Sequence, residues 1–307
     1  MAALRPPLVL ANRALDWVER NLTSFEPFKG EAEPNIPRQQ ALVELAMLSM
    51  YLKRLPDFAN PRLRLYLQFI SHVYNMPLFK ERLVRVTRDF IPQAFLRVIL
   101  RETGLDTGDH EWEAVQTLID SGNVCSSERP PYAMLELRHL LDLGQFAHGL
   151  PSYSELYRSS FASKRVNFIS TSDHDAYSIT HVLFFMSDFG FQPITAISAS
   201  EIRRIADNVQ HLLGMYIIRG NWDLVGELML ACHCLRQTTS DFYAFGWQAL
   251  ANAQLESGAV PGPYYDYKQA SARDGTNLQE YLFSTCYHTT LVSALVGAVC
   301  PYLTPEC

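Results

Sequence analysis

The stretch "YAMLELRHLLDLGQF" at residues 132–146 resembles a second stretch, "YSITHVLFFMSDFGF", at residues 177–191. A shift of 45 residues places Tyr132 on Tyr177 and Glu136 on His181. The Asp-Leu-Gly near the end of the first stretch corresponds, one residue further along, to an Asp-Phe-Gly in the second. Another apolar segment begins about 45 residues later. A helix pair of this length is therefore the repeating unit, and such pairs in series form an open solenoid or a closed ring.

The rest of the chain has the same helical character. Apolar residues recur at spacings of three and four, which is typical of amphipathic helices, and Gly and Pro separate the segments. The segments predicted to be helical are 14–22, 40–55, 62–74, 79–90, 92–102, 111–119, 132–143, 177–189, 202–218, 222–235, 242–255 and 278–299. The sequence predicts an all-α fold, an α/α toroid or incomplete α/α barrel built from helix-pair repeats of about 45 residues.

The domain organisation follows from the absence of a clear linker. We expect residues 1–307 to form a single helical domain. Within it, residues 1–125 form a looser N-terminal part, and residues 130–300 carry the clearest helix-pair repeats.

Composition limits the classes of partner. The 307 residues are 48% hydrophobic and 19% charged, with a net charge of −6. No basic stripe is present, so we expect no nucleic-acid partner. No apolar run reaches the length of a membrane span, and no secretory signal is evident, so we expect a cytoplasmic protein. The six cysteines are sparse and uneven, which favours free thiols in a reducing compartment.

Candidate chemistry lies on the helices with few charges, which we expect to line the middle of a ring. Glu136, His181, Glu227 and His288 come from four different helices, each within an otherwise apolar face. A closed ring would direct all four toward one cavity. Carboxylates and imidazoles gathered in a cleft tend to have displaced pKa values, which suits acid/base chemistry near neutral pH.

The candidate residues fall into two groups. The candidate catalytic residues are His181, as the main acid or base, with Glu136, Glu227, Asp173 and Asp175. The candidate substrate-binding residues are Tyr132, Tyr177, Phe184, Ser284 and His288. No cofactor is favoured, but zinc held by His288 with His181 or Cys232 stays open as an alternative.

Each candidate also has a purely structural interpretation. A lone histidine on an apolar helix is often a core residue with one backbone partner. Glu136 lies close to Arg138 and His139 in the sequence and so fits a surface ion pair. Asp173 or Ser172 fits a helix N-cap. Asp188 precedes a glycine by two residues, and the equivalent Asp in the other repeat favours a turn.

Three fragments resemble the α/α-toroid group, which contains proton-initiated terpene cyclases, protein prenyltransferase β-subunits and lanthionine cyclases. "LANAQLESGAVPG" (250–262) is similar to the outer-helix ending and Gln-containing turn of those repeats. "YHTTLVSAL" (287–295) is similar to the prenyltransferase segment whose histidine binds zinc, which corresponds to His288. "SDHDAYS" (172–178) is similar to the acidic motif of the cyclases, although His174 interrupts it. The resemblance covers about residues 130–300 and implies the fold, not one reaction.

The sequence therefore supports three hypotheses of function. The first is a small-molecule tailoring enzyme (a cyclase, lyase or isomerase) that uses acid/base groups in an apolar, aromatic-lined cavity. The second is a zinc-dependent toroid enzyme. The third is a helical-repeat scaffold that binds a peptide or protein in its concave face. We expect a small-molecule or peptide substrate, and a ring that closes either within one chain or through a homodimer.

Overall fold

The computed structural model describes residues 6–31, 33–56, 61–80, 90–105 and 109–303, and these residues confirm the all-α prediction. No β-strand occurs among them. Most observed helices match the predicted segments closely. The first helix begins at Pro6 and not at residue 14, and periodicity does not reveal several short helices. The predicted helix 79–90 falls largely outside the described residues.

The chain divides into two units. The main unit comprises Met1–Arg20 and Ser152–Cys307, and the inserted unit comprises Asn21–Pro151. The main unit contains α1 (Pro6–Arg20), α10 (Tyr153–Ser159), η4 (Phe161–Ser163), α11 (Asp173–Ser187), α12 (Ala199–Arg219), α13 (Trp222–Cys234), α14 (Asp241–Ala253), α15 (Tyr267–Ser271) and α16 (Gly275–Leu303). The inserted unit contains η1 (Leu22–Phe25), α2 (Ile36–Lys53), α3 (Pro61–Tyr74), α4 (Pro77–Lys80), α6 (Phe90–Glu102), α7 (Asp109–Asp120), α8 (Asn123–Ser126) and α9 (Pro131–Leu143). The repeated stretches therefore lie in different units, on α9 and α11.

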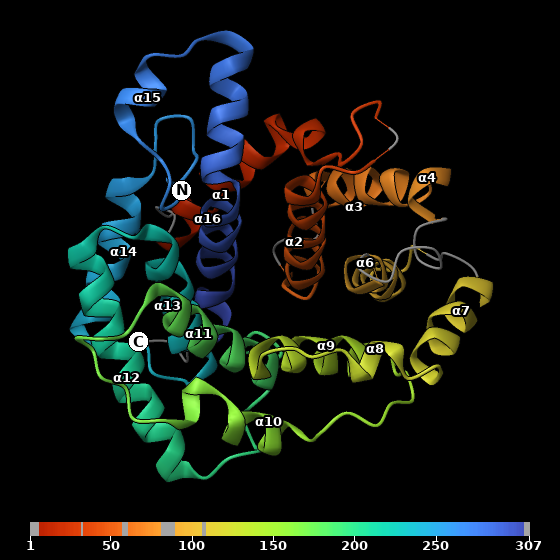
Figure 1. The fold of residues 1–307 in the computed structure, drawn as a ribbon. Coiled ribbons are helices and arrows are strands. Elements are labelled where there is room, and N and C mark those ends of the chain that lie inside the picture. The colour runs from red at the N-terminus through yellow and green to blue at the C-terminus, as the bar shows by residue number, and fades with distance from the viewer. Residues whose placement is uncertain (1–5, 32, 57–60, 81–89, 106–108, 304–307) are drawn as a thin grey trace. The chain divides into compact units, whose positions relative to one another are not determined.

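The two ends of the chain pack together in the main unit. Helix α1 lies along α16. Figure 1 draws the two helices in colours from opposite ends of its scale, because they come from opposite ends of the chain. The two helices approach so closely that Gly297 has no room for a side chain. A Cβ atom at this position would lie 2.6 Å from the carbonyl oxygen of Pro7. The turn after α14 also holds α1, since Gln254 Nε2 donates to the carbonyl oxygen of Leu10 at 3.1 Å. Local periodicity cannot reveal this long-range pairing.

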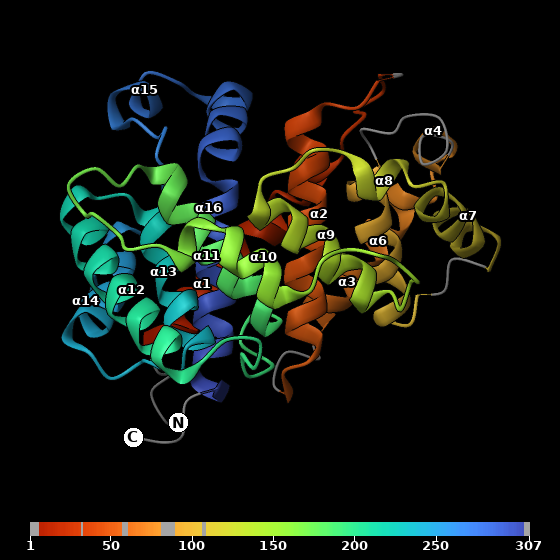
Figure 2. The same ribbon diagram turned by 60° about the horizontal axis from the view of Figure 1, so that its bottom comes forward.

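Helix α13 is the centre of the main unit. It packs against α11, α12, α14 and α16 (Figure 2). Every residue from Asp223 to Cys234 is buried. A helix buried on all sides normally carries only apolar side chains, so the two carboxylates on α13 require specific partners.

The inserted unit has its own core. Helix α2 packs against α3 and α6, and α6 packs against α9. Arg97 on α6 is buried and pairs with Glu111 on α7, with Nη1 and Oε2 2.8 Å apart. The Tyr74 hydroxyl donates to the same Oε2 atom at 2.8 Å. The bonds join α3, α6 and α7 within this unit.

One helix of the described residues is long and apolar enough to cross a membrane by length and composition. It comprises Gly275–Val299 of α16, and 67% of its most apolar window is buried inside the protein. A core helix passes the same test, so the described residues contain no clear membrane span.

The α1–α16 contact predicts the effect of Gly297→Ala. The added methyl group would overlap the Pro7 carbonyl and also lie 3.0 Å from Ala11 Cβ. We expect the free energy of unfolding to fall by about 2 kcal/mol, as for an overpacked core. Urea unfolding measures this. Gly149→Ala is the matched control because a Cβ atom added there would meet nothing within 4 Å, and equal losses in both variants would contradict the prediction.

His233 predicts a loss of stability in acid. Burial, followed by Arg236, lowers the pKa of His233 to about 4, and its Nε2 lies 2.6 Å from the Tyr243 hydroxyl. The unfolded chain therefore takes up this proton near pH 6.5, before the folded chain does. The neutral His233 side chain therefore contributes to the free energy of unfolding in full above about pH 6.5. This contribution, up to roughly 3 kcal/mol, is lost as the pH falls to about 4. Urea unfolding of His233→Gln between about pH 7 and 4.5 should show a flatter profile than the parent. Parallel profiles would contradict the assignment.

Candidate functional site

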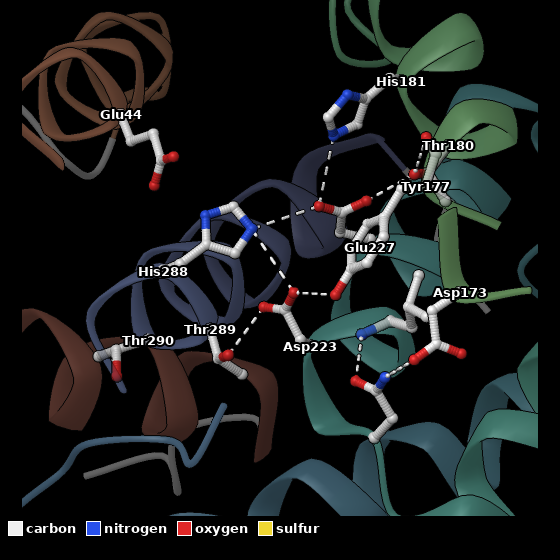
Figure 3. Close-up of polar contacts among 12 residues, drawn as sticks. Glu44, Asp173, Tyr177, Thr180, His181, Asp223, Glu227, His288, Thr289 and Thr290 are labelled. Atoms are coloured by element: carbon white, nitrogen blue, oxygen red, sulfur yellow. Dashed lines mark hydrogen bonds and ion pairs between the residues drawn. The ribbon is translucent and has the colours of Figure 1, made fainter. Parts of the chain in front are cut away.

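The main unit brings two acidic residues of α13 against histidines from two other helices. Asp223 and Glu227 are four residues apart and so lie on one face of α13. Only 3% of Asp223 and 1% of Glu227 is exposed. Helix α11 contributes His181, and α16 contributes His288, as Figure 3 shows. We call Asp223, Glu227, His181 and His288 the carboxylate–histidine cluster.

Glu227 is the central member of the cluster. Its Oε2 atom accepts a hydrogen bond of 2.5 Å from the Thr180 hydroxyl. Its Oε1 atom faces both imidazoles, 3.4 Å from Nε2 of His288 and 3.6 Å from Nε2 of His181. One oxygen is therefore held by a neutral donor, and the other is shared by two histidines.

Asp223 is held in a similar way. The Tyr177 hydroxyl donates to Oδ2 at 2.6 Å, and the Thr289 hydroxyl donates to Oδ1 at 2.7 Å. Nε2 of His288 lies 3.6 Å from Oδ2. His288 thus reaches both carboxylates, whereas His181 reaches only Glu227 among the two (Figure 3).

A glycine allows α13 and α16 to approach closely at this point. A Cβ atom on Gly226 would lie 2.8 Å from Cγ1 of Val292. Gly226 directly precedes Glu227, and Val292 is one helical turn after His288. A larger side chain at Gly226 would separate the helix that carries the carboxylates from the helix that carries His288.

The electrostatics of the two carboxylates differ. Burial raises the pKa of Asp223 despite the opposing effect of His288, and the Glu227 carboxylate adds to the rise. Burial alone would also raise the pKa of Glu227, but His181 and His288 outweigh it and hold that pKa below its usual range. Burial and the neighbouring carboxylates raise the pKa of the Tyr177 phenol, so Tyr177 is a neutral hydrogen-bond donor.

The cluster is accessible from its imidazole side. The side chains of His181 and His288 are 33% and 34% exposed, whereas those of Glu227 and Asp223 are 2% and 4% exposed. A ligand from solution would therefore meet the histidines before the carboxylates. Aromatic rings lie beside both histidines, with Phe184 6.0 Å from His181 and Tyr287 6.3 Å from His288 between ring centroids.

The arrangement also fits a metal ion. One ligand atom from each of Asp223, Glu227 and His288 lies within 4.8 Å of the other two. Carboxylate oxygen and imidazole nitrogen are common ligands of zinc, iron and manganese. Among the residues the structure describes, neither carboxylate pairs with a lysine or arginine, so the histidines are their only cationic partners.

The structure brings together four of the residues singled out from the sequence. Tyr177, His181, Glu227 and His288 meet around one group of polar atoms. Phe184 is buried beside His181.

Two predicted catalytic aspartates have structural partners instead. Asp175 forms a capping box with Ser172, whose backbone N–H and hydroxyl both donate to Oδ2. Asp173 accepts hydrogen bonds from the Tyr216 hydroxyl at 2.9 Å and from Asn221 Nδ2 at 3.2 Å. These bonds fix the start of α11 against α12 and the beginning of α13.

The remaining candidates are on α9, α13 and α16. Glu136 and Tyr132 are on α9, which belongs to the inserted unit. Ser284 is exposed, and its hydroxyl donates to the carbonyl oxygen of Tyr281. Cys232 is fully buried, burial raises the pKa of its thiol, and its Sγ accepts from Gln210 Nε2 at 3.4 Å. The metal-compatible group of described residues does not include Cys232.

Sequence reasoning does not identify Asp223, Thr180 or Thr289 as site residues. Asp223 has a usable signal, because it precedes Glu227 by one helical turn in a segment that is otherwise apolar. The threonines have none, since a buried helical threonine more often bonds its own helix, as Thr290 does to the Cys286 carbonyl.

The fold and site together define an all-α protein with a buried carboxylate–histidine cluster. A family model described as "Domain of unknown function (DUF6895)" matches residues 11–298, and the chain belongs to this family. No curated protein and no solved structure matches the chain.

The hydrogen bond from Thr289 to Asp223 predicts how substitutions of Thr289 change the free energy of unfolding. Thr289→Val keeps the volume but leaves Oδ1 of a buried carboxylate without its hydroxyl donor, which costs about 1–3 kcal/mol. Thr289→Ser keeps the hydroxyl and removes one methyl group, worth about 0.8 kcal/mol. Urea unfolding in the presence of a chelator should therefore show a larger loss for valine than for serine. The opposite order would contradict the proposed role of the hydroxyl.

Proposed function

We propose that the protein is an enzyme that binds a divalent transition-metal ion through Asp223, Glu227 and His288 and acts on a small molecule beside it. The observation that carries the proposal is the spacing of the facing atoms. Oε1 of Glu227 and Oδ2 of Asp223 lie 3.4 Å and 3.6 Å from Nε2 of His288. These distances are long for hydrogen bonds, which prefer about 2.7–3.2 Å.

The same distances suit ligands of a common ion. Tetrahedral zinc has bonds of about 2.0–2.1 Å to nitrogen and oxygen, so two of its ligand atoms lie about 3.3 Å apart. The ligand types also accept iron(II) or manganese(II), so zinc is one member of the expected class.

Charge supports the proposal independently. Two buried carboxylates one helical turn apart repel each other and lose hydration, which is costly without compensation. A divalent ion would neutralise both charges. The hydroxyl groups of Tyr177, Thr180 and Thr289 would orient the carboxylates, as outer hydrogen bonds do around metal ligands.

A bound ion would supply Lewis acidity, and the chain would supply orientation. The aromatic rings beside the histidines favour a substrate with an apolar part. A cyclase, lyase or isomerase reaction remains our hypothesis, as do cytoplasmic localisation and the α/α-toroid relationship, which rests on the three sequence fragments. A peptide-binding scaffold has no need of a buried carboxylate–histidine cluster, which favours the enzyme.

A second candidate is acid/base chemistry without metal. It is favoured by one observation, that both histidines face the same Oε1 atom of Glu227. In that case, protonated imidazoles compensate the carboxylates.

Metal analysis of the purified protein tests the proposal. We expect about one transition-metal ion per chain by inductively coupled plasma mass spectrometry after expression in metal-supplemented medium. His288→Ala and Glu227→Gln should lose the ion because each removes one of three ligands. Added metal at about 100 times its Kd should stabilise the parent by roughly 2.7 kcal/mol, raising Tm.

Cys232→Ala is the informative control, because it tests the thiol considered as a zinc ligand from the sequence and should retain the ion. Circular dichroism verifies that each variant is folded. A parent protein that carries no ion and shows no Tm shift with zinc, manganese or iron(II) would contradict the metal proposal. The metal-free acid/base mechanism would then be the better candidate.

A further inference from the structure

We infer that the metal site keeps at least one exchangeable coordination position on its imidazole side, and that a small oxygen ligand, such as a carbonyl or hydroxyl group of the substrate, binds there. This inference rests on the proposed function, because it concerns the same site. It adds that the site is of the catalytic and not the structural kind. Structural zinc sites are closed by four protein ligands, whereas catalytic sites use three and leave one position for water or substrate.

The number of converging ligands supports an open position. The group of atoms that lie within 4.8 Å of one another comes, among the described residues, from Asp223, Glu227 and His288 alone. His181 is the nearest candidate for a fourth ligand, and its Nε2 is 3.6 Å from Oε1 of Glu227. It nevertheless falls outside the group, so it lies beside the site without closing it.

The hydroxyl donors favour binding of the ion through one oxygen of each carboxylate. Bidentate binding would need both oxygens of a carboxylate. Thr180 holds Oε2 of Glu227 at 2.5 Å, and Thr289 holds Oδ1 of Asp223 at 2.7 Å. Oδ2 of Asp223 accepts from the Tyr177 hydroxyl at 2.6 Å and would bind the ion through its second lone pair. With Oε1 of Glu227 and Nε2 of His288, the protein then supplies three ligand atoms.

The direction of the open position follows from burial. The carboxylates come from α13, which is buried along its whole length from Asp223 onward. The side chains of His181 and His288 are each about one-third exposed. An incoming ligand must approach from the imidazole side.

Charge and surroundings indicate the class of ligand. A divalent ion with two carboxylates has no net charge, so a neutral oxygen donor meets no electrostatic penalty. Tyr177 and Phe184 lie beside His181, with ring centroids 6.4 Å and 6.0 Å from its imidazole. We therefore expect a neutral or singly charged oxygen donor attached to an apolar or aromatic group.

The test uses cobalt(II) and two hydroxamates as probes. The metal-free full-length chain is loaded with Co²⁺, whose visible spectrum reports the number and geometry of its ligands. Acetohydroxamate and benzohydroxamate are then titrated separately. We expect a saturable 1:1 spectral change with both, and tighter binding of benzohydroxamate because of its aromatic ring. His181→Ala should keep its Co²⁺ affinity within about tenfold, the lower end of what removal of an indirect partner costs.

The outcomes separate this inference from the proposed function. Failure of the parent chain to bind Co²⁺ would overturn both. Tight Co²⁺ binding that His288→Ala abolishes, with a spectrum that neither hydroxamate alters, would overturn the open position alone. Loss of Co²⁺ from His181→Ala as complete as from His288→Ala would also overturn it, because the site would then be closed by four protein ligands. His211→Ala, at an exposed histidine of α12, is the matched control and should behave like the parent.

Discussion

The burial of two carboxylates on α13 is the constraint on which the main unit depends. Asp223 and Glu227 lie on α13, in which every residue from Asp223 to Cys234 is buried. Leaving either charge without partners would cost several kcal/mol, more than most single contacts supply. Tyr177 and Thr180 on α11 and Thr289 on α16 satisfy the oxygens with short hydrogen bonds. These bonds fix α11 and α16 against α13 in one register, because a shift of one residue would turn the hydroxyls away.

The rest of the main unit supports that register. Gly226 lets α16 approach α13 next to Glu227, and Gly297 lets α1 approach α16 further along. The hydrogen bonds to Asp173 from Tyr216 and Asn221 secure the start of α11, one turn before Tyr177. Packing and polar contacts therefore serve the same purpose, which is to hold three helices around a group of atoms that would be unstable alone.

The helices are predictable from the sequence because their apolar spacing is a local property. Tyr177, His181, Glu227 and His288 are predictable too, since polar residues within apolar faces are unusual. The pairing of α1 with α16 and the division into two units arise from contacts between distant residues, which periodicity does not encode. Asp175, a predicted catalytic residue, forms a capping box with Ser172 three residues earlier, a pattern that the sequence does contain. Thr180 and Thr289 give no signal because their role depends on which helix faces them.

The two histidines have nearly equal exposure, yet their positions give them different roles. In the sequence, His181 is the main candidate, because it interrupts a strongly apolar repeated segment. In the structure, His288 contacts both carboxylates, and His181 contacts one of them. Removing His288 takes away an interaction from each carboxylate, whereas removing His181 leaves the pairing of His288 with Asp223 and Glu227 intact. The geometry thus favours His288 as the ligand of an ion. His181 lies beside the accessible edge of the cluster, where it can contact a bound molecule.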